Sequence, residues 1–390
     1  MRRYFSGITR NTVLLTFASL FADISTEMLY PVLPVFLTQT LRASGSIVGL
    51  VEGVAGATQN IVQGFSGSLS DKLRKRKSIA MVGYALAALG KPLIGLSSVW
   101  QGVLGGRFLD RLGTGIRSAP RDALIAASVD EGNRGKAFGL EGVGDNAGAF
   151  LGPLLAVLLL SVLHVPIRLI FYIAVIPGLL AFAMITLVAE GRSAAPDAKI
   201  GLKTGQFPRA YWTYLLATAI FGIGNSSNAF LILQTKALGA SLTTTILIYA
   251  GFNLVAALIS YPAGFLSDRL GRRNVLLVSF ALFLAAYLGF ALTRSLVVIS
   301  LLFGLYGLSQ GVFRSAGKAL ASDLSPEELR AGGVGWYSTT VGLTGLAASL
   351  AAGLIWDRVG HNAVFLLGAG SGVAGSIALL ALVPAKPVRG

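Results

Sequence analysis

The amino-acid sequence predicts an all-α integral membrane protein in which about twelve transmembrane helices form two pseudo-symmetric six-helix bundles. Of its 390 residues, 54% are hydrophobic and only 13% are charged, which is about half the charged fraction of a soluble domain. Apolar runs of about 20 residues, bounded by short polar turns, are long enough to cross a bilayer as helices. Landmarks of the first half of the chain also recur in the second half. Regular strand alternation is absent from the sequence, so a β-barrel is not favoured.

Twelve apolar runs with the length of a membrane-spanning helix follow one another along the chain. The weakest divisions are the long first run and the region 78–119, where only Ser97 and Ser98 interrupt the apolar residues. The predicted spans are 11–38, 46–68, 78–97, 99–119, 136–160, 167–189, 211–233, 242–267, 274–292, 296–320, 332–354 and 362–383.

Lysine and arginine are unevenly distributed between the two sets of loops that these spans define. The N-terminal tail, the loops after the even-numbered spans and the C-terminal tail hold most of the 32 basic residues. The opposite loops hold only Arg42, Arg168, Lys236, Arg294 and Arg358. Because loops rich in Lys and Arg stay in the cytoplasm, we expect a multi-pass protein of the cell (inner) membrane with both termini cytoplasmic. The net charge of +15 then serves as an orientation signal and contacts membrane lipid, and no nucleic-acid partner is expected.

The chain carries one short motif twice, at the ends of its second and eighth spans. The Gly-Ser-Leu-Ser-Asp run that starts at Gly67 returns as Gly-Phe-Leu-Ser-Asp at Gly264, 197 residues later. Two halves with matching landmarks are typical of membrane proteins built from parallel repeats. The sequence therefore predicts an N-terminal bundle at 1–189 and a C-terminal bundle at 211–390, joined by a polar cytoplasmic linker at 190–210.

The second copy of this motif, Gly-Phe-Leu-Ser-Asp-Arg-Leu-Gly-Arg-Arg at 264–273, resembles the signature loop of the major facilitator superfamily. The first copy departs from the family at Arg74, where the family has its second glycine. The resemblance implies a transporter fold in which these loops form a cytoplasmic latch that stabilises one conformation. A basic loop that only orients the protein in the membrane is the alternative interpretation. The expected latch residues are Gly67, Asp71, Lys72, Gly264, Asp268, Arg269 and Arg272.

Two further segments are similar to motifs of that superfamily. The fourth span has Arg107 ahead of a face of spaced glycines, although Asp110 and Arg111 replace the family's usual Gln and Gly. The fifth span, with Gly148 and the pair Gly152-Pro153, resembles the helix 5 motif of proton-coupled exporters, but its closing glycine pair is Leu-Ala here. A face of small residues that only packs against another helix is the alternative for the fifth span.

Ionisable side chains inside the predicted spans are candidates for proton coupling, because a charge within a bilayer costs several kcal/mol and usually marks an ion or substrate route. Three pairs are spaced i, i+4 and so share a helix face. A carboxylate beyond those that the arginines neutralise is suited to carry a proton. A static ion-pair network that joins the first, fourth and fifth spans is the alternative. The candidates are Asp23, Glu27, Glu52, Arg107, Asp110, Arg111, Glu141 and Asp145.

The C-terminal half has no Asp or Glu inside its predicted spans, and its midplane polar residues are neutral. This division predicts proton coupling in the N-terminal half and a solute cavity that both halves share. The candidate cavity residues are Tyr30, Asn225, Asn228, Asn253 and Gln310.

Several kinds of chemistry are excluded by residue content. The chain has no cysteine, and His164 and His361 fall in short loops, so no metal site is expected. No phosphate-binding Gly-Lys-Ser/Thr loop is present, which argues against ATP hydrolysis. We therefore expect no cofactor and no enzymatic activity, with a proton gradient as the driving force.

The expected function is proton-coupled secondary transport by alternating access, with antiport and efflux of a small organic solute favoured. A proton symporter and an exporter of an anionic solute or a divalent metal are the alternatives within this class. An ion channel fits the half-length repeat poorly, whereas a non-transporting receptor or lipid-handling protein on the same fold stays open. The expected partners are a small-molecule or ion substrate and membrane lipid, and the expected oligomeric state is a monomer.

Overall fold

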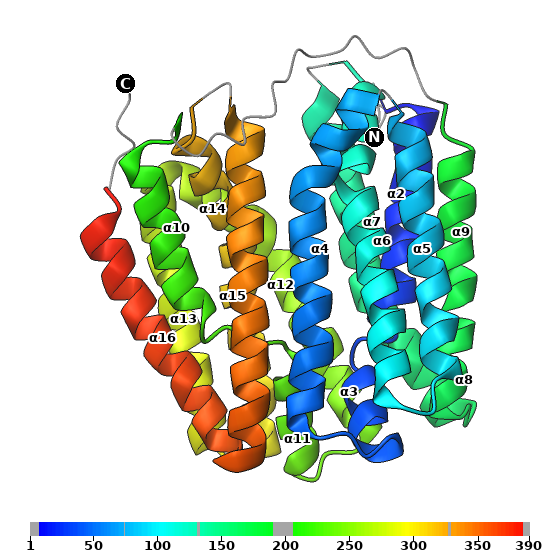
Figure 1. The fold of residues 1–390 in the computed structure, drawn as a ribbon, viewed down its shortest axis with the longest axis vertical. Coiled ribbons are helices and arrows are strands. Elements are labelled where there is room, and N and C mark those ends of the chain that lie inside the picture. Colours follow the sequence, from blue (N-terminus) through cyan, green and yellow to red (C-terminus); the bar gives the residue numbers. More distant parts are fainter. Residues whose placement is uncertain (1–7, 74, 131–132, 190–205, 327–328, 385–390) are drawn as a thin grey trace. The chain divides into compact units, whose positions relative to one another are not determined.

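A computed structural model of the protein describes residues 8–73, 75–130, 133–189, 206–326 and 329–384. Across these residues the regular structure is helical and no strand is present (Figure 1), which confirms the predicted all-α class. The helices are α2 (Arg10–Glu27), α3 (Leu33–Val35), α4 (Gly45–Leu73), α5 (Arg76–Leu96), α6 (Trp100–Ala127), α7 (Arg134–Val157), α8 (Ile167–Ile173), α9 (Val175–Thr186), α10 (Arg209–Gly222), α11 (Ala229–Ala237), α12 (Leu242–Leu270), α13 (Arg272–Leu292), α14 (Leu296–Asp323), α15 (Arg330–Arg358) and α16 (His361–Leu382), and π-helical turns follow α3 at Phe36–Thr40 and α7 at Leu158–Val162.

Within the described residues, eight helical stretches are long and apolar enough to cross a membrane by length and composition. Helix α6 is not among them, because the ionisable residues that it carries lower its mean hydropathy. The total of twelve spans stays a prediction. The eight stretches are Arg76–Leu96, Lys136–Val162, Ile167–Thr186, Leu242–Ser260, Arg272–Leu292, Leu296–Asp323, Gly332–Arg358 and His361–Leu382.

Two predicted spans are interrupted in the structure. The run 11–38 forms α2, which ends at Glu27, and resumes as a helix only at Leu33, because Pro31 and Pro34 cannot donate backbone hydrogen bonds. The run 211–233 is likewise divided into α10 and α11 by residues 223–228, which include one glycine and two asparagines. The repeat spacing of 197 residues places the first interruption in register with the second. Paired interruptions in two halves are a feature of transporter binding sites.

The described helices divide into two compact units. Unit 1 comprises Met1–Phe36 and Ile61–Ala198, and unit 2 comprises Leu37–Asn60 and Lys199–Gly390. The first half of α4 thus packs with unit 2, although it precedes the predicted linker by more than a hundred residues. Most of that linker, 190–205, lies outside the described residues, so the predicted bundle limits stay predictions.

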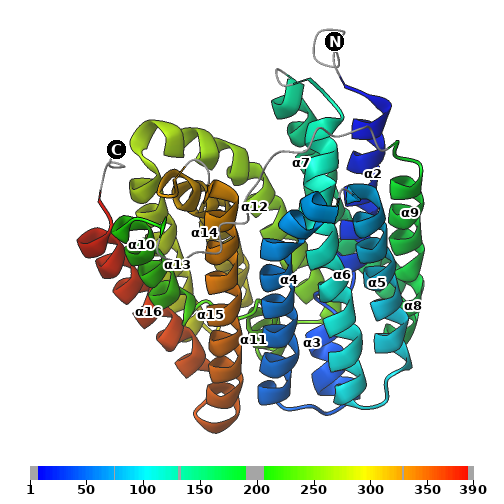
Figure 2. The same cartoon turned by 45° about the horizontal axis from the view of Figure 1, so that its top comes forward.

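Unit 1 is built on close pairs of helices, α5 with α6 and α2 with α7 (Figures 1 and 2). A Cβ atom on Gly90 of α5 would lie 2.6 Å from the backbone nitrogen of Asp110 on α6. A Cβ atom on Gly148 of α7 would lie 2.5 Å from the carbonyl oxygen of Leu20 on α2. Only glycine fits at such separations, and the small residues of the fifth predicted span therefore do form a packing face.

In unit 2, the first half of α4 lies against the last part of α15. The glycine face of α4 meets small residues of α15, and a Cβ atom on Gly353 would lie 2.7 Å from the Cα atom of Ser46. The carboxylate of Asp357 accepts hydrogen bonds from the backbone N–H groups of Gly45 and Ser46, both at 2.8 Å, and from the Ser46 hydroxyl. These N–H groups belong to the first turn of α4 and have no partner within their own helix. Asp357 therefore acts as a cap for α4 that a second helix supplies.

Replacement of Asp357 by Ala is expected to loosen the first turn of α4. The substitution removes the acceptor for two backbone N–H groups, and the loss of a helix cap costs about 0.5–2 kcal/mol. Hydrogen–deuterium exchange should show faster exchange of the Gly45 and Ser46 amides, while amides in the middle of α13 keep their rates. Asp130→Ala, at another exposed aspartate, is the matched control. Equal exchange at α4 in both variants would contradict the capping role.

Candidate functional site

Helix α6 carries a row of ionisable side chains that we call the α6 ion ladder: Arg107, Asp110, Arg111, Arg117 and Arg121. The spacing of these residues follows the turns of the helix, so that they share one face. All but Arg121 are buried. Helix α6 also extends to Ala127, eight residues beyond the predicted end of its span. This extension brings Arg121 into the site, since Arg121 lies beyond the predicted end of the span. Arg117 lies inside the predicted span but is not among the predicted site residues.

The first part of the ladder surrounds Asp110. Lys91 of α5 donates from Nζ to Asp110 Oδ1 at 2.9 Å, and Arg107 donates from Nη1 to Asp110 Oδ2 at 3.0 Å. Arg111 Nε lies 3.4 Å from the same Oδ2. The Asp110 side chain is only 1% exposed and that of Lys91 only 2%. Three cations thus meet one buried carboxylate. The guanidinium of Arg107 also lies over the ring of the predicted cavity residue Tyr30, 5.5 Å from its centroid.

The second part of the ladder pairs Arg117 with Asp23 of α2. Arg117 Nη2 lies 3.7 Å from Asp23 Oδ1, and the guanidinium stacks over the Tyr84 ring at 4.7 Å. Asp145 of α7 lies one turn before Gly148, where an added Cβ atom would lie 2.8 Å from the Cβ atom of Asp23. The sequence identifies Arg107 and Arg111 as the candidate arginines of this helix, but the arginine that pairs with Asp23 here is Arg117.

The third part of the ladder centres on Arg121. Its Nη1 lies 2.9 Å from Glu141 Oε1 and 3.9 Å from an oxygen of Asp145, and the same Nη1 donates to the Ser19 hydroxyl at 2.9 Å. Ser19 in turn donates to Glu141 Oε1 at 2.8 Å. The predicted pair Glu141 and Asp145 therefore does share one face, and Arg121 bridges the two carboxylates. Asp122 accepts from Arg121 on the exposed side, at 2.8 Å.

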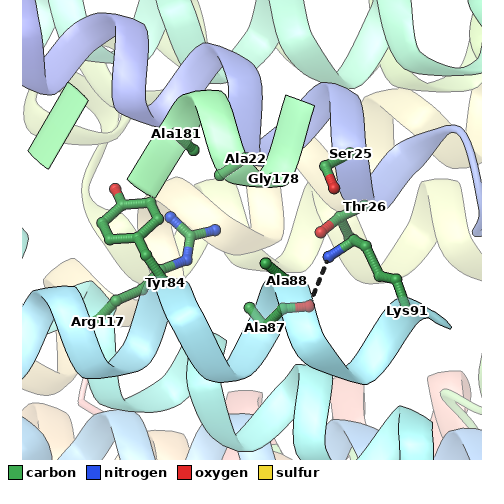
Figure 3. A pocket seen from close by; sticks show the side chains of 10 residues that line it. All are labelled: Ala22, Ser25, Thr26, Tyr84, Ala87, Ala88, Lys91, Arg117, Gly178 and Ala181. Atoms are coloured by element: carbon green, nitrogen blue, oxygen red, sulfur yellow. Dashed lines mark hydrogen bonds between the residues drawn. The ribbon is translucent and has the colours of Figure 1, made fainter. Parts of the chain in front are cut away.

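A small cavity of unit 1 lies between the first two parts of the ladder (Figure 3). Lys91 borders it at one end and Arg117 with Tyr84 at the other, as the close-up shows. Ser25 and Thr26 of α2 supply hydroxyl groups to its wall. Among the described residues, the Tyr84 hydroxyl and the Nε and Nη1 atoms of Arg117 have no hydrogen-bond partner. The cavity is therefore lined by polar groups that can still donate.

Two further predicted coupling residues, Glu27 and Glu52, lie on α2 and α4. Glu27 is the last residue of α2 and is half-buried. Glu52 is buried on the part of α4 that belongs to unit 2. The helix 5 residues Gly152 and Pro153 are buried in α7, and Gly152 faces the backbone of α2.

Unit 2 contains an uncharged polar cluster, which we call the amide cluster: Asn225, Asn228, Tyr306 and Gln310. The Tyr306 hydroxyl donates to Asn228 Oδ1 at 2.8 Å and lies 3.4 Å from Asn225 Oδ1. Gln310 Nε2 donates to the Tyr306 hydroxyl at 2.9 Å and to Asn225 Oδ1 at 3.3 Å. Three of the predicted cavity residues are thus joined, and Tyr306 is the residue that joins them. Sequence reasoning missed it, although Tyr306 lies four residues before Gln310 on the same span and therefore shares a helix face with it.

The ring of Tyr306 belongs to an aromatic wall beside this cluster. Phe252 of α12 stacks on it with centroids 5.3 Å apart and an interplanar angle of 17°. Tyr249 lies 5.6 Å from Phe252 on the same helix. The predicted cavity residue Asn253 follows Phe252 on α12 and is half-buried.

The predicted latch residues are fully described only in their second copy. Asp268 lies 3.3 Å from Arg272 Nη2 in its own loop, and Arg272 also pairs with Asp323 at the end of α14. The guanidinium of Arg269 lies over the Phe265 ring at 4.3 Å. At Gly264, an added Cβ atom would meet open space. A latch role therefore stays a prediction.

In the first copy, a Cβ atom on Gly67 would lie 3.1 Å from Ala119 of α6. The side chains of Asp71 and Lys72 lie outside the described residues. Over the part of the chain that the structure describes, no group of three or more His, Asp or Glu residues is arranged to hold a metal ion.

Comparisons with known proteins agree with this architecture. An uncharacterized MFS-type transporter of Methanocaldococcus jannaschii is 36% identical over 382 residues, which cover 96% of this chain and 95% of that protein. The quinolone resistance protein NorA of Staphylococcus aureus is 27% identical over 205 residues, about half of each chain (51% and 52%). The crystal structure of a D-xylose-proton symporter has a TM-score of 0.74 at 15% identity and covers 96% of this chain and 97% of that one.

A family model described as Major Facilitator Superfamily matches residues 15–233 and 214–390. The two matches together extend over nearly the whole chain and meet near α10, where the sequence repeat places the start of its second half. Because the archaeal relative is similar over almost the same length, the match does not depend on a single motif. The chain therefore belongs to the major facilitator superfamily.

Proposed function

We propose that the protein is a proton-coupled secondary transporter that exports a small organic solute by antiport and alternating access. The approach of α7, which carries Asp145, to Asp23 on α2, beside the buried Arg117, carries this proposal. Two neighbouring carboxyl groups favour a state in which one of them holds a proton, since two ionised carboxylates repel each other. Such a pair takes up and releases one proton as its surroundings change. Arg117 and Arg121 supply the charge that compensates the deprotonated state.

The two units divide the work in this proposal. The α6 ion ladder of unit 1 binds the proton, and the amide cluster of unit 2 binds the solute. A proton gradient is the driving force, and no cofactor takes part. Twelve helices cross the inner membrane with both termini in the cytoplasm, and the monomer is the working unit. The relation to NorA supports efflux as the direction, because that relative is a resistance protein.

Transport into sealed vesicles tests this function. Everted membrane vesicles that contain the protein receive an imposed gradient with an acid lumen, and a panel of cationic, neutral and anionic aromatic solutes is offered outside. We expect at least one solute to accumulate in the lumen and to leave when nigericin collapses the gradient. Accumulation that instead requires an acid exterior would identify a symporter. Binding without flux for every solute would identify a non-transporting receptor.

An anionic solute is the second candidate substrate, and the surroundings of Asp110 favour it. Lys91, Arg107 and Arg111 bring three positive charges to one carboxylate. Accumulation of the anionic members of the panel, with rejection of the cationic ones, would support this candidate.

A further inference from the structure

The amide cluster has more unused hydrogen-bond donors than unused acceptors. The phenol of Tyr306 gives its only proton to Asn228, and the two N–H groups of Gln310 go to Tyr306 and Asn225. The carbonyl oxygens of both asparagines are therefore used inside the cluster. Among the described residues, neither asparagine Nδ2 group has an acceptor, so four N–H donors are left for something else, against the Gln310 oxygen and the second lone pair of the Asn228 oxygen as acceptors.

The position of these donors suits a bound molecule. Asn225 and Asn228 lie in the interruption between α10 and α11, three residues apart, and both are half-buried. Two amides at this spacing can converge on neighbouring acceptor atoms. The stacked rings of Phe252 and Tyr306 provide a flat apolar surface beside them. The N-terminus of α11 begins directly after Asn228, and a helix N-terminus favours negative charge.

The three helices that carry the amide cluster offer a cation no carboxylate near it in the described residues. On α10, α11 and α14 the only carboxylate in the described residues is Asp323, the last residue of α14, which pairs with Arg272. Asp323 follows Gln310 by 13 residues, or about 20 Å along the helix axis. A bound ammonium group would therefore meet amide N–H donors without a counter-ion.

We propose that the amide cluster selects a planar aromatic solute that carries two adjacent oxygen acceptors, either uncharged or anionic, and that it rejects aromatic cations. This assignment of a substrate class rests on the proposed transport function. The amide groups of Asn225 and Asn228 donate hydrogen bonds to the paired oxygens of the solute, and the rings of Phe252 and Tyr306 stack against its aromatic ring. A site built to donate hydrogen bonds discriminates strongly against a molecule that lacks the matching acceptors.

Equilibrium binding to the purified full-length protein in nanodiscs tests the proposal. The probes are 2-hydroxybenzoate, which has a ring with adjacent oxygens, and benzyltrimethylammonium, a cation of similar size. Isothermal titration at one pH and without a gradient should give a Kd for 2-hydroxybenzoate at least tenfold lower than that for the cation. Tighter binding of the cation by the wild-type protein would overturn the proposal.

Asn228→Asp is the decisive variant, because it replaces two donors by a carboxylate of the same shape. We expect it to raise the Kd for 2-hydroxybenzoate at least tenfold and to lower the Kd for the cation, so that the binding preference reverses. The control is Asn274→Asp on α13, an exposed position at which both Kd values should be unchanged. Tyr306→Phe keeps the ring but removes the hydroxyl that orients Asn228. We expect this variant to raise the Kd for 2-hydroxybenzoate several-fold. An unchanged ratio in both cluster variants, with the wild-type melting temperature, would refute the assignment.

These measurements separate the substrate class from the transport function. Binding without a gradient tests only the cluster, whereas vesicle flux tests only coupling. Proton-driven flux of a cation with no binding preference for 2-hydroxybenzoate would leave transport intact and defeat the substrate class. The expected preference without flux would defeat transport alone.

Discussion

Replacement of Asp110 by Asn is expected to destabilise the protein more than any other single substitution in unit 1. The carboxylate of Asp110 is the common partner of Lys91, Arg107 and Arg111, and it is almost fully buried. Asparagine keeps the shape but removes the charge, which leaves the surrounding cations undercompensated. Removal of one partner from a buried ion pair typically costs about 3–5 kcal/mol. Thermal unfolding in detergent and the monodisperse fraction on size exclusion should both fall sharply.

Two further variants test whether the loss of stability comes from the buried charge of Asp110. Asp122→Asn lies on the same helix, but its side chain is 43% exposed and its ion pair with Arg121 reaches solvent. Exposed pairs contribute about 0–1 kcal/mol, so this control should unfold close to the wild-type temperature. In the double variant Asp110→Asn with Lys91→Met, one cation is removed together with the carboxylate. We expect it to recover part of the loss, as a positive coupling in a double-mutant cycle. An Asp110→Asn protein as stable as the wild type would show that the cluster is not structural.

Replacement of Asp23 by Asn is expected to uncouple transport from the proton gradient. Asp23 is paired with Arg117 at 3.7 Å and is about one-fifth exposed, so its loss should leave the fold in place. An amide cannot take up and release a proton at this position. Gradient-driven accumulation in vesicles should therefore fall by at least tenfold. Exchange of labelled for unlabelled solute across the membrane should continue, since exchange moves no net proton.

The comparison of the two flux measurements distinguishes a residue that couples transport to protons from a residue that only supports the structure. Asp145→Asn should behave in the same way, because Asp145 lies on the part of α7 that approaches Asp23 and is 3.9 Å from Arg121. Asp130→Asn, in an exposed position after α6, should retain both activities. If exchange and gradient-driven accumulation fell together in Asp23→Asn, with a lower melting temperature, the residue would belong to a static network.

The length of the apolar runs predicts most of the helices correctly. It fails where prolines or asparagines break a helix inside such a run. Helices α5, α13 and α16 begin and end within two residues of the predicted spans, because their sequences are apolar between clear polar turns. The breaks at 28–32 and 223–228 were not predicted, since prolines and asparagines inside an apolar run lower its hydropathy only slightly. The packing of the first half of α4 with unit 2 was also beyond reach, because it depends on contacts between glycines far apart in the chain.

The candidate site was likewise predicted only in part. Spacing identified the faces of Asp23, Glu141 and Asp145, since i, i+4 pairs must lie together on a helix. It could not identify their partners, because Arg121 lies beyond the predicted end of its span and the packing of α2 beside α6 determines that Arg117 meets Asp23. Tyrosine is common in apolar spans, so nothing in the sequence alone distinguishes Tyr306 from its packing neighbours. Hydrogen-bond geometry supplies that distinction.

The pairing of Lys91 with Asp110 also has a consequence for biogenesis. At the centre of a span, translocon-insertion scales give a penalty of roughly 3 kcal/mol for each Arg or Asp. Helix α6 carries Arg107, Asp110 and Arg111 in succession, and it is not among the stretches apolar enough to partition on its own. Helix α5 is apolar, meets α6 through glycines and brings the matching cation. The two helices should therefore leave the translocon together, as a hairpin. A variant that weakens their contact should be lost to membrane proteases during synthesis, before any question of transport arises.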